Sequence, residues 1–320
     1  MTLFGRCGML CRKENVSSIL PEEGGMGYSM HKSVLCAKES KIMAAIFMRF
    51  PGGRGKALTL SYDDCVEQDI RLVEIMQKNG LKGTFNLNSG LYAPEGKVYP
   101  QGQVHRRMTK KRAQELFIDS GMEVAVHSYT HPWLEQLPVN VCTMEVIRDR
   151  EALEEDYDCI VRGMAYPMGT FDDEVVEVLK QCGIAYSRTT VSTEKFDIPT
   201  DWLRMPATCH HNNPKLMELA QEFVNNTFRK PVLFYLWGHS YEFEGKDNWN
   251  VIEEFAEYVG NRDDIWYATN IEIYDYIKAY EQLQFSVNGE KVYNPTNTDL
   301  YFVRGGNTYC VKPGETACLA

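Results

Sequence analysis

The segment Glu123–Pro132, EVAVHSYTHP, constrains this chain more than any other stretch of its sequence. Its apolar run Val124–Val126 is typical of a buried strand and leads directly into His127, which His131 follows four residues later. Two imidazoles at the end of a buried strand indicate one divalent metal ion at the mouth of a sheet or barrel. The spacing equals that of the peptidase motif HExxH, but the glutamate is absent, so a zincin mechanism is not expected.

A metal site of this kind needs a carboxylate, and a second predicted strand supplies one. The stretch Ala57–Asp64 reads ALTLSYDD and ends in two adjacent acidic residues. Side chains alternate along a strand, so Asp63 and Asp64 point in different directions, and one can bind the metal while the other faces a substrate. The alternative is an ordinary helix N-cap, because a helical pattern begins at Val66.

Composition and charge bound the class of protein. The chain has 320 residues, enough for one large α/β barrel or two ordinary domains. Its net charge of −10 argues against a nucleic-acid or anionic-membrane partner, because both require a basic face.

No apolar run is long enough to span a bilayer, and the N-terminal stretch lacks the sustained apolar core of a signal peptide. We therefore expect a cytoplasmic protein with reduced cysteines.

From Ala44 onwards, short apolar runs alternate with segments of helical periodicity. The expected strands are 57–62, 83–88, 123–127, 161–166, 184–188, 202–205, 232–237 and 265–268. This alternation predicts an α/β fold, a distorted (β/α)7-8 barrel resembling a TIM barrel, with an open doubly wound sheet as the alternative. In a barrel the active site lies at the C-terminal ends of the strands. The candidate residues at these ends are Asp63, Asp64, His127, Tyr166 and His239.

Three regions are expected along the chain. Residues 1–42 show no periodicity and are interpreted as a weakly ordered N-terminal extension, while residues 43–283 form the predicted barrel. Residues 284–320 consist of short alternating runs with the turn signals Asn288-Gly289 and Gly305-Gly306, which predict a small β-hairpin appendage. This appendage either packs on the barrel or joins subunits of a possible homo-oligomer.

Two of the strand ends carry a specific resemblance to a known family. The chain resembles the polysaccharide deacetylase family, also called the NodB homology domain or carbohydrate esterase family 4. The family's first motif, TFDDG, is similar to residues 61–65, SYDDC, with Cys65 in place of the glycine. Its second motif, H-S/T-x-x-H, is matched without change by residues 127–131. The resemblance covers roughly residues 44–280.

The remaining family motifs are matched with departures. The third motif, RxPYG, resembles AYPMG at 165–169, where Ala165 replaces the arginine that orients the base. We expect Arg188 to replace that arginine because it ends a predicted strand; Arg162 and Arg204 are the alternatives. The Leu-x-His motif resembles WGH at 237–239. A weaker match, Asp201-Trp202, stands for the family's Asp-Trp element, and its aspartate would either orient His239 or be an ordinary helix-cap or loop residue.

The resemblance implies a role for each matched residue. Asp64, His127 and His131 would hold one divalent metal ion, with Zn²⁺ as the first expectation. Asp63 would be the general base, and His239 the general acid that protonates the departing amine. The residues expected to bind the oxyanion or the substrate are Met168, Tyr166, Trp237 and Arg188.

Three functions fit this set of residues. The first is a deacetylase that removes an N-acyl group, acetyl above all, from an amino sugar. The second is a related amidase or deformylase acting on a small non-sugar amide. The third is a catalytically inactive carbohydrate-binding protein with the same fold. His210-His211 would be either a fourth ligand or substrate contact or a plain loop pair. Glu242 and Glu244 are expected to be solvated, with contacts to a substrate amine or hydroxyls as the alternative.

Overall fold

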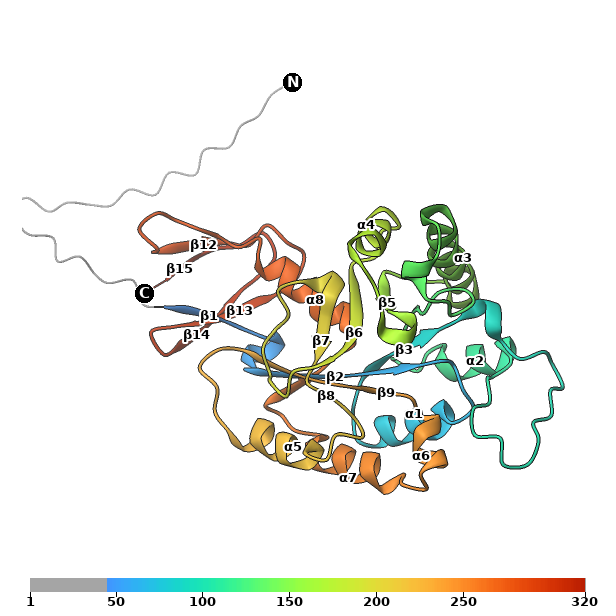
Figure 1. Ribbon diagram of the computed structural model, residues 1–320. Helices are drawn as coiled ribbons and strands as arrows, with labels where there is room; N and C mark the ends of the chain where they lie inside the picture. Colours follow the sequence, from blue (N-terminus) through green and yellow to red (C-terminus); the bar gives the residue numbers. More distant parts are fainter. Residues whose placement is uncertain (1–44, 320) are drawn as a thin grey trace, which may run out of the picture. The chain divides into compact units, whose positions relative to one another are not determined.

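The computed structural model describes residues 45–319, which alternate between strands and helices over most of their length (Figure 1). The expected N-terminal extension, 1–42, lies outside the described residues. One parallel sheet is built from β2 Lys56–Asp63, β3 Gly83–Leu87, β4 Glu123–Val126, β5 Gly163–Ala165, β6 Tyr186–Ser192, β7 Met205–Ala207, β8 Cys209–His210, β9 Val232–Gly238 and β10 Ile265–Tyr267. The helices are α1 Asp69–Lys78, α2 Lys110–Phe117, α3 Val139–Tyr157, α4 Asp173–Gln181, α5 Leu216–Asn225, α6 Tyr241–Gly245, α7 Asn250–Val259 and α8 Asn270–Tyr280.

The sheet confirms the predicted α/β fold with parallel strands. Its order is β7-β6-β5-β4-β3-β2-β9-β8, and β10 pairs with the first half of β2. The two end strands, β7 and β8, are consecutive in the chain, and only Thr208 separates them. The Thr208 N–H donates to the Tyr235 carbonyl of β9 at 2.9 Å, and the Glu194 N–H donates to the Thr208 carbonyl at 2.8 Å. The hydrogen-bonded ladder is therefore an open path whose two ends meet, as in a distorted barrel.

The predicted strand list differs from the structure at several places: β6 begins and ends later than predicted, β8 was not predicted, and the strand predicted at 202–205 is misplaced. Residues 202–205 were expected to form a strand, but Trp202–Arg204 form a 3₁₀ turn, and the strand β7 follows it. The Asp201 side chain begins this turn by accepting the Leu203 N–H at 3.1 Å. A capping carboxylate of this kind favours a turn over an extended chain.

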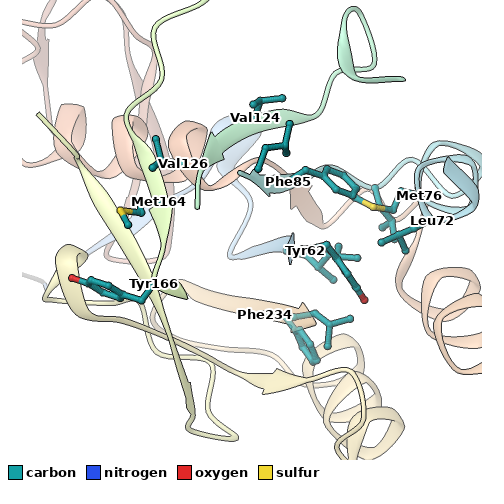
Figure 2. Close-up of a cluster of buried hydrophobic side chains, with 14 of the residues drawn as sticks. Tyr62, Leu72, Met76, Phe85, Val124, Val126, Met164, Tyr166 and Phe234 are labelled. Atoms are coloured by element: carbon teal, nitrogen blue, oxygen red, sulfur yellow. The ribbon is translucent and has the colours of Figure 1, made fainter. Parts of the chain in front are cut away.

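Side chains alternate along β2 between a helix-covered outer face and the interior enclosed by the strands. Leu58, Leu60 and Tyr62 belong to the outer core. Figure 2 shows part of this core, with Phe85 of β3 beside Leu72 and Met76 of α1. The helices α1, α5 and α7 lie next to one another on this side of the sheet (Figure 1). Burial of each such side chain contributes roughly 1.5–3 kcal/mol.

The interior face of the sheet is polar at its N-terminal end. Glu123 of β4 accepts hydrogen bonds from the Tyr186 hydroxyl (2.7 Å), the Thr84 hydroxyl (2.8 Å) and the Ile271 N–H (2.9 Å). The last donor belongs to the first turn of α8, so the N-terminus of that helix closes this end of the interior. Gly163 makes room for the Tyr186 ring, because a Cβ there would lie 2.1 Å from the tyrosine oxygen.

The tail beyond α8 consists of strands. One small antiparallel sheet contains β11 Gln284–Phe285, β12 Lys291–Tyr293 and β15 Thr316–Cys318. The other pairs β13 Leu300–Arg304 with β14 Asn307–Val311 and with β1 Ile46–Arg49, which precedes the barrel in the chain. Among residues 45–319, none of the helices combines the length and the apolar character that a membrane span requires.

Candidate active site

The three predicted metal ligands meet at the C-terminal ends of β2 and β4. His127 follows β4, and its Nδ1–H donates to the Ala165 carbonyl at 2.8 Å, which leaves Nε2 free. That Nε2 lies 3.2 Å from His131 Nε2, and His131 Nε2 lies 3.8 Å from Asp64 Oδ1. The three ligand atoms all fall within 4.8 Å of one another. A carbonyl that fixes the far nitrogen of a histidine is the usual support of a metal ligand.

The donor set fits a divalent metal ion. Bonds of about 2.0–2.1 Å to a tetrahedral ion place neighbouring nitrogen and oxygen ligands roughly 3.3 Å apart, close to the separations seen here. Burial lowers the pKa of His127 to about 4 and also lowers the pKa of His131, so both imidazoles are neutral at pH 7. Neutral imidazole is the form that binds a metal. One carboxylate and two imidazoles suit zinc among other divalent ions.

The loops that carry the ligands adopt unusual backbone conformations. Asp64 has φ 84°, Cys65 has φ 53°, and His131 has φ 57°, all in the left-handed region. Residues other than glycine avoid this region, and such strain gathers at functional sites. Cys65 occupies the position of the glycine in the family motif, where the backbone still needs the left-handed conformation. Ser128 Oγ stabilises the second loop by accepting the His131 N–H at 3.1 Å.

Two basic side chains, which the sequence analysis missed, hold Asp64. Arg107 Nη2 donates to Asp64 Oδ1 at 3.0 Å, and His105 Nε2 lies 3.4 Å from Oδ2. Burial opposes ionisation of Asp64, but His105, His127 and Arg107 outweigh it and hold its pKa far below the usual range. His105 and Arg107 lie in the long connection between β3 and α2, which has no periodicity that could have indicated a site.

Asp63 lies beside the candidate metal ligands, and each of its two carboxylate oxygens has a hydrogen-bond or ion-pair partner. Arg188 Nη2 forms an ion pair with Oδ2, and Asn86 Nδ2 donates to Oδ1 at 2.8 Å. Burial raises the pKa of this carboxyl, but the Arg188 guanidinium and the nearby histidines reverse that effect and lower the pKa. Arg188 is the register partner of Ala165 across β5 and β6. It therefore reaches Asp63 from the strand next to the one that carries the family's arginine.

The other two candidate arginines are engaged elsewhere. Arg162 forms an ion pair with Asp275, with the closest atoms 2.6 Å apart. Arg204 pairs with Asp173 and Asp201 on the surface. Neither contacts Asp63.

His239 faces Asp63 from the end of β9. Its Nε2 lies 3.7 Å from Asp63 Oδ2, and its Nδ1 lies 2.9 Å from Glu242 Oε1. Burial would lower the pKa of His239, but the hydrogen bond that it donates to Glu242 and the charge of Asp63 raise it. The expectation that Asp201 orients His239 is wrong, because Asp201 caps the 3₁₀ turn and pairs with Arg204. Glu242, which was expected to be solvated, is the carboxylate that accepts the His239 Nδ1–H.

Of the residues predicted to contact the substrate or the oxyanion, Tyr166 faces away from the site. Trp237 points into the interior near the site, with the Arg188 guanidinium carbon 4.4 Å from its ring centroid. Met168 has φ 57° in the turn that follows β5. Tyr166 does not line the site, because it is buried in the outer core and its hydroxyl donates to the Leu203 carbonyl at 2.7 Å. Side chains alternate along a strand, so the residue after the inward-facing Ala165 faces outward.

Comparison with known proteins gives one family match. Residues 51–187 match the sequence model of the family described as polysaccharide deacetylase. No curated protein sequence matches the chain significantly.

One solved structure shows the same fold, and two others are weaker matches. A protein from Mycobacterium smegmatis assigned to the polysaccharide deacetylases is 18% identical with a TM-score of 0.53, and the match covers 74% of this chain and 95% of that one. The family 4 carbohydrate esterase from Streptomyces lividans is 18% identical, covering 63% and 88%, with a TM-score of 0.42. The Streptococcus pyogenes deacetylase PplD is 23% identical, with a TM-score of 0.37, and the match covers 41% of this chain and 55% of that one. The resemblance to the polysaccharide deacetylase family that the motifs predict is thus confirmed, over residues 51–187 of the chain.

Proposed function

We propose that this protein is a metal-dependent hydrolase that removes an N-acyl group, acetyl in the first place, from an amino sugar. The observation that carries the proposal is the position of Asp63. Its Oδ2 lies 3.7 Å from His239 Nε2 and 3.9 Å from His127 Nε2, between an imidazole that can donate a proton and a metal-ligand histidine. Hydrolysis of an amide needs a base for the water and an acid for the amine.

The ligands Asp64, His127 and His131 would hold the ion, with Zn²⁺ as our first candidate. A divalent ion bound there supplies a Lewis acid that polarises the acyl carbonyl and lowers the pKa of a water molecule. Asp63 is ionised at neutral pH because of its lowered pKa, and it accepts the proton of the attacking water. The new carbon–oxygen bond then forms, and the Met168 N–H stabilises the negative charge that develops on the acyl oxygen.

His239 completes the reaction by donating the proton on Nε2 to the nitrogen as the carbon–nitrogen bond breaks. An amide anion is a very poor leaving group, so this proton is required. The raised pKa of His239 keeps a larger fraction of the imidazole protonated near neutral pH. An ionised carboxylate beside an imidazole of raised pKa favours a hydrolase over an inactive binding protein.

Metal content and turnover test the assignment together. The purified protein should contain about one divalent ion per chain, given the single triad of ligands. His127→Ala should lose the ion, whereas Asp63→Asn should retain it and lose turnover by roughly 10²–10⁴-fold, the usual contribution of a general base. Exposed Glu95→Gln is the control and should change neither. An Asp63→Asn enzyme with normal turnover would refute the mechanism.

A substrate panel separates the possible reactions. We expect acetate release from N-acetylated amino sugars and their oligomers, measured by coupled assay or mass spectrometry. Formate or ammonia from small amides, with no acetate from sugars, would instead assign the amidase function. No release from any compound, in protein loaded with metal, would leave only a binding role.

A further inference from the structure

A second cluster of polar side chains lies behind His239, and the reaction described above does not use it. Its centre is Glu242 in the short helix α6. Glu242 Oε1 accepts from His239 Nδ1 at 2.9 Å and lies 3.4 Å from His210 Nε2. Its Oε2 accepts from the Asn212 amide and lies 3.0 Å from Lys246 Nζ. These donors make Glu242 a permanent anion, and its pKa lies far below the usual range although burial opposes this.

The cluster also has the composition of a metal site, but its hydrogen bonds favour another interpretation. Ligand atoms of His210, His211 and Glu242 lie within 4.8 Å of one another. However, the Asn212 N–H donates to His210 Nδ1 at 3.1 Å, so the ring proton of neutral His210 is on Nε2, facing Glu242. A protonated nitrogen cannot bind a metal, and the Lys246 cation already neutralises the carboxylate. The geometry is that of a hydrogen-bonded anion.

His211, a further side chain next to Glu242, is packed between aromatic rings. Its ring is completely buried and stacks on the Tyr62 ring with the centroids 5.7 Å apart, while the tilted Phe243 ring has its centroid 4.1 Å away. Burial lowers its pKa to about 4, so it is neutral. Gly238 is required here, because a Cβ at that position would lie 2.0 Å from His211 Nδ1. The glycine before His239 thus allows the His211 ring to pack against the end of β9.

We propose that Glu242 is the positioning residue of His239. It holds the Nδ1–H of the imidazole, so that Nε2 carries its proton toward the leaving nitrogen. His210, Asn212 and Lys246 in turn fix the carboxylate, and Glu242 thereby takes the place expected for Asp201. This inference rests on the proposed function, because it assigns a role within that reaction.

The electrostatic consequence depends on every group that faces His239. Asp63 lies 3.7 Å away, and the charge of Asp64 also reaches the ring. The rings of Tyr241, Trp237 and His210 lie 5.2, 5.9 and 6.3 Å from it, and they contribute no anion. Removal of the Glu242 charge leaves only the two aspartates to oppose the cost of burial. The imidazolium is then less stable, and a neutral acceptor holds the proton on Nδ1 less strongly than a carboxylate does.

The variants Glu242→Gln and Glu242→Asp test the proposal on metal-loaded enzyme. Glu242→Gln should keep the metal and a KM within about threefold, and lose kcat by roughly 10²-fold, part of the contribution of a general acid. The alkaline limb of its pH profile should move to lower pH, and Glu242→Asp should recover part of kcat. The matched control is Glu244→Gln on the same helix, which contacts Arg106 and Gln68 instead of a histidine. Unchanged kcat and pH profile in Glu242→Gln would refute the proposal.

Nitrogen-15 spectra of the histidine side chains give a readout that needs no substrate. The wild-type protein should show His239 protonated at Nδ1 with a hydrogen-bonded proton signal, and Glu242→Ala, which has no acceptor for this proton, should lose that signal. If no amide is hydrolysed but this change is seen, the proposed reaction fails while the hydrogen-bonded pair stands. Two metal ions per chain, one of them lost in His210→Ala, would overturn the proposal in favour of a second metal centre.

Discussion

At the scale of single residues, the best-defined feature is the buried carboxylate Asp63 and the arginine that holds it. The family places this arginine on the strand that here carries Ala165. Arg188 comes from the next strand, and its guanidinium reaches the same carboxylate. The side chains of both positions point into the interior, because register partners on neighbouring strands share a face. The charge stays in place although the residue that supplies it has moved.

Exchange of the two positions tests this interpretation. Arg188→Ala should retain metal but lower kcat by roughly 10²-fold, because a base without orientation contributes less. Arg188→Lys should recover less activity than the double variant Ala165→Arg/Arg188→Ala, since a lysine cannot supply a planar fork. Thermal unfolding must accompany the assay, because an unpaired buried Asp63 costs about 3–5 kcal/mol. Arg162→Ala, which breaks only a surface pair, is the control. Full activity in Arg188→Ala would contradict the assignment.

Local patterns in the sequence were enough to predict that the three candidate metal ligands meet, but not which residues support them. Asp64, His127 and His131 follow apolar strands, and parallel strands bring their ends together, so their proximity could be anticipated. Glu242 was missed because most of its partners come from a distant segment, residues 210–212. The one local signal was its spacing, three residues after His239 and four before Lys246 in a short helix, which aligns all three on one face. Arg107 had no such signal.

At the scale of elements, the contact between β4 and α8 closes the interior opposite the active site. Glu123 begins β4 and receives the N–H of Ile271 in the first turn of α8. The partial positive charge of a helix N-terminus favours a carboxyl group at this place. Burial nevertheless raises the pKa of Glu123 to about 7. Protonation of this residue is therefore linked to the stability of the fold.

The sign of this linkage gives a prediction. A carboxyl group with a raised pKa contributes stability that is fully present below its unfolded pKa, near 4.5, and is lost as pH rises through about 7. The free energy of unfolding should therefore fall across this window by up to about 3 kcal/mol from this group alone. Glu123→Gln should flatten the curve, whereas exposed Glu95→Gln should not. Urea unfolding at several pH values measures the effect, and an unchanged slope in Glu123→Gln would exclude it.

At the scale of the whole molecule, the tail is connected to the barrel through residues far apart in the chain. Leu300 of β13 is fully buried in the same cluster as Met48, Phe50 and Leu233. The Tyr276 hydroxyl of α8 donates to the Arg49 carbonyl at 2.7 Å and accepts the Tyr301 N–H at 3.1 Å. The turn signals at 288–289 and 305–306 indicated strands locally, but no local pattern could indicate that β13 pairs with β1.

We propose that the tail unfolds together with the barrel. Leu300→Ala should lower the free energy of unfolding by about 2–5 kcal/mol, the usual cost of a buried cavity. Tryptophan fluorescence from the barrel and far-ultraviolet circular dichroism should report one common transition. Val287→Ala, at a fully exposed position of the tail, is the control and should change stability by less than about 0.5 kcal/mol. A barrel transition that Leu300→Ala leaves unchanged would show an independent tail.

The move of the arginine from the position of Ala165 to Arg188 bears on how sequences of this kind are sorted. A classification that requires arginine at the third motif would place this chain among inactive proteins. In the structure the Arg188 guanidinium forms an ion pair with Asp63, although it comes from the neighbouring strand. Register partners on neighbouring strands share a face, so an arginine at either position can point toward the same carboxylate. Catalogues of lost activity in barrel enzymes should therefore be checked against the neighbouring strand before a protein is counted as inactive.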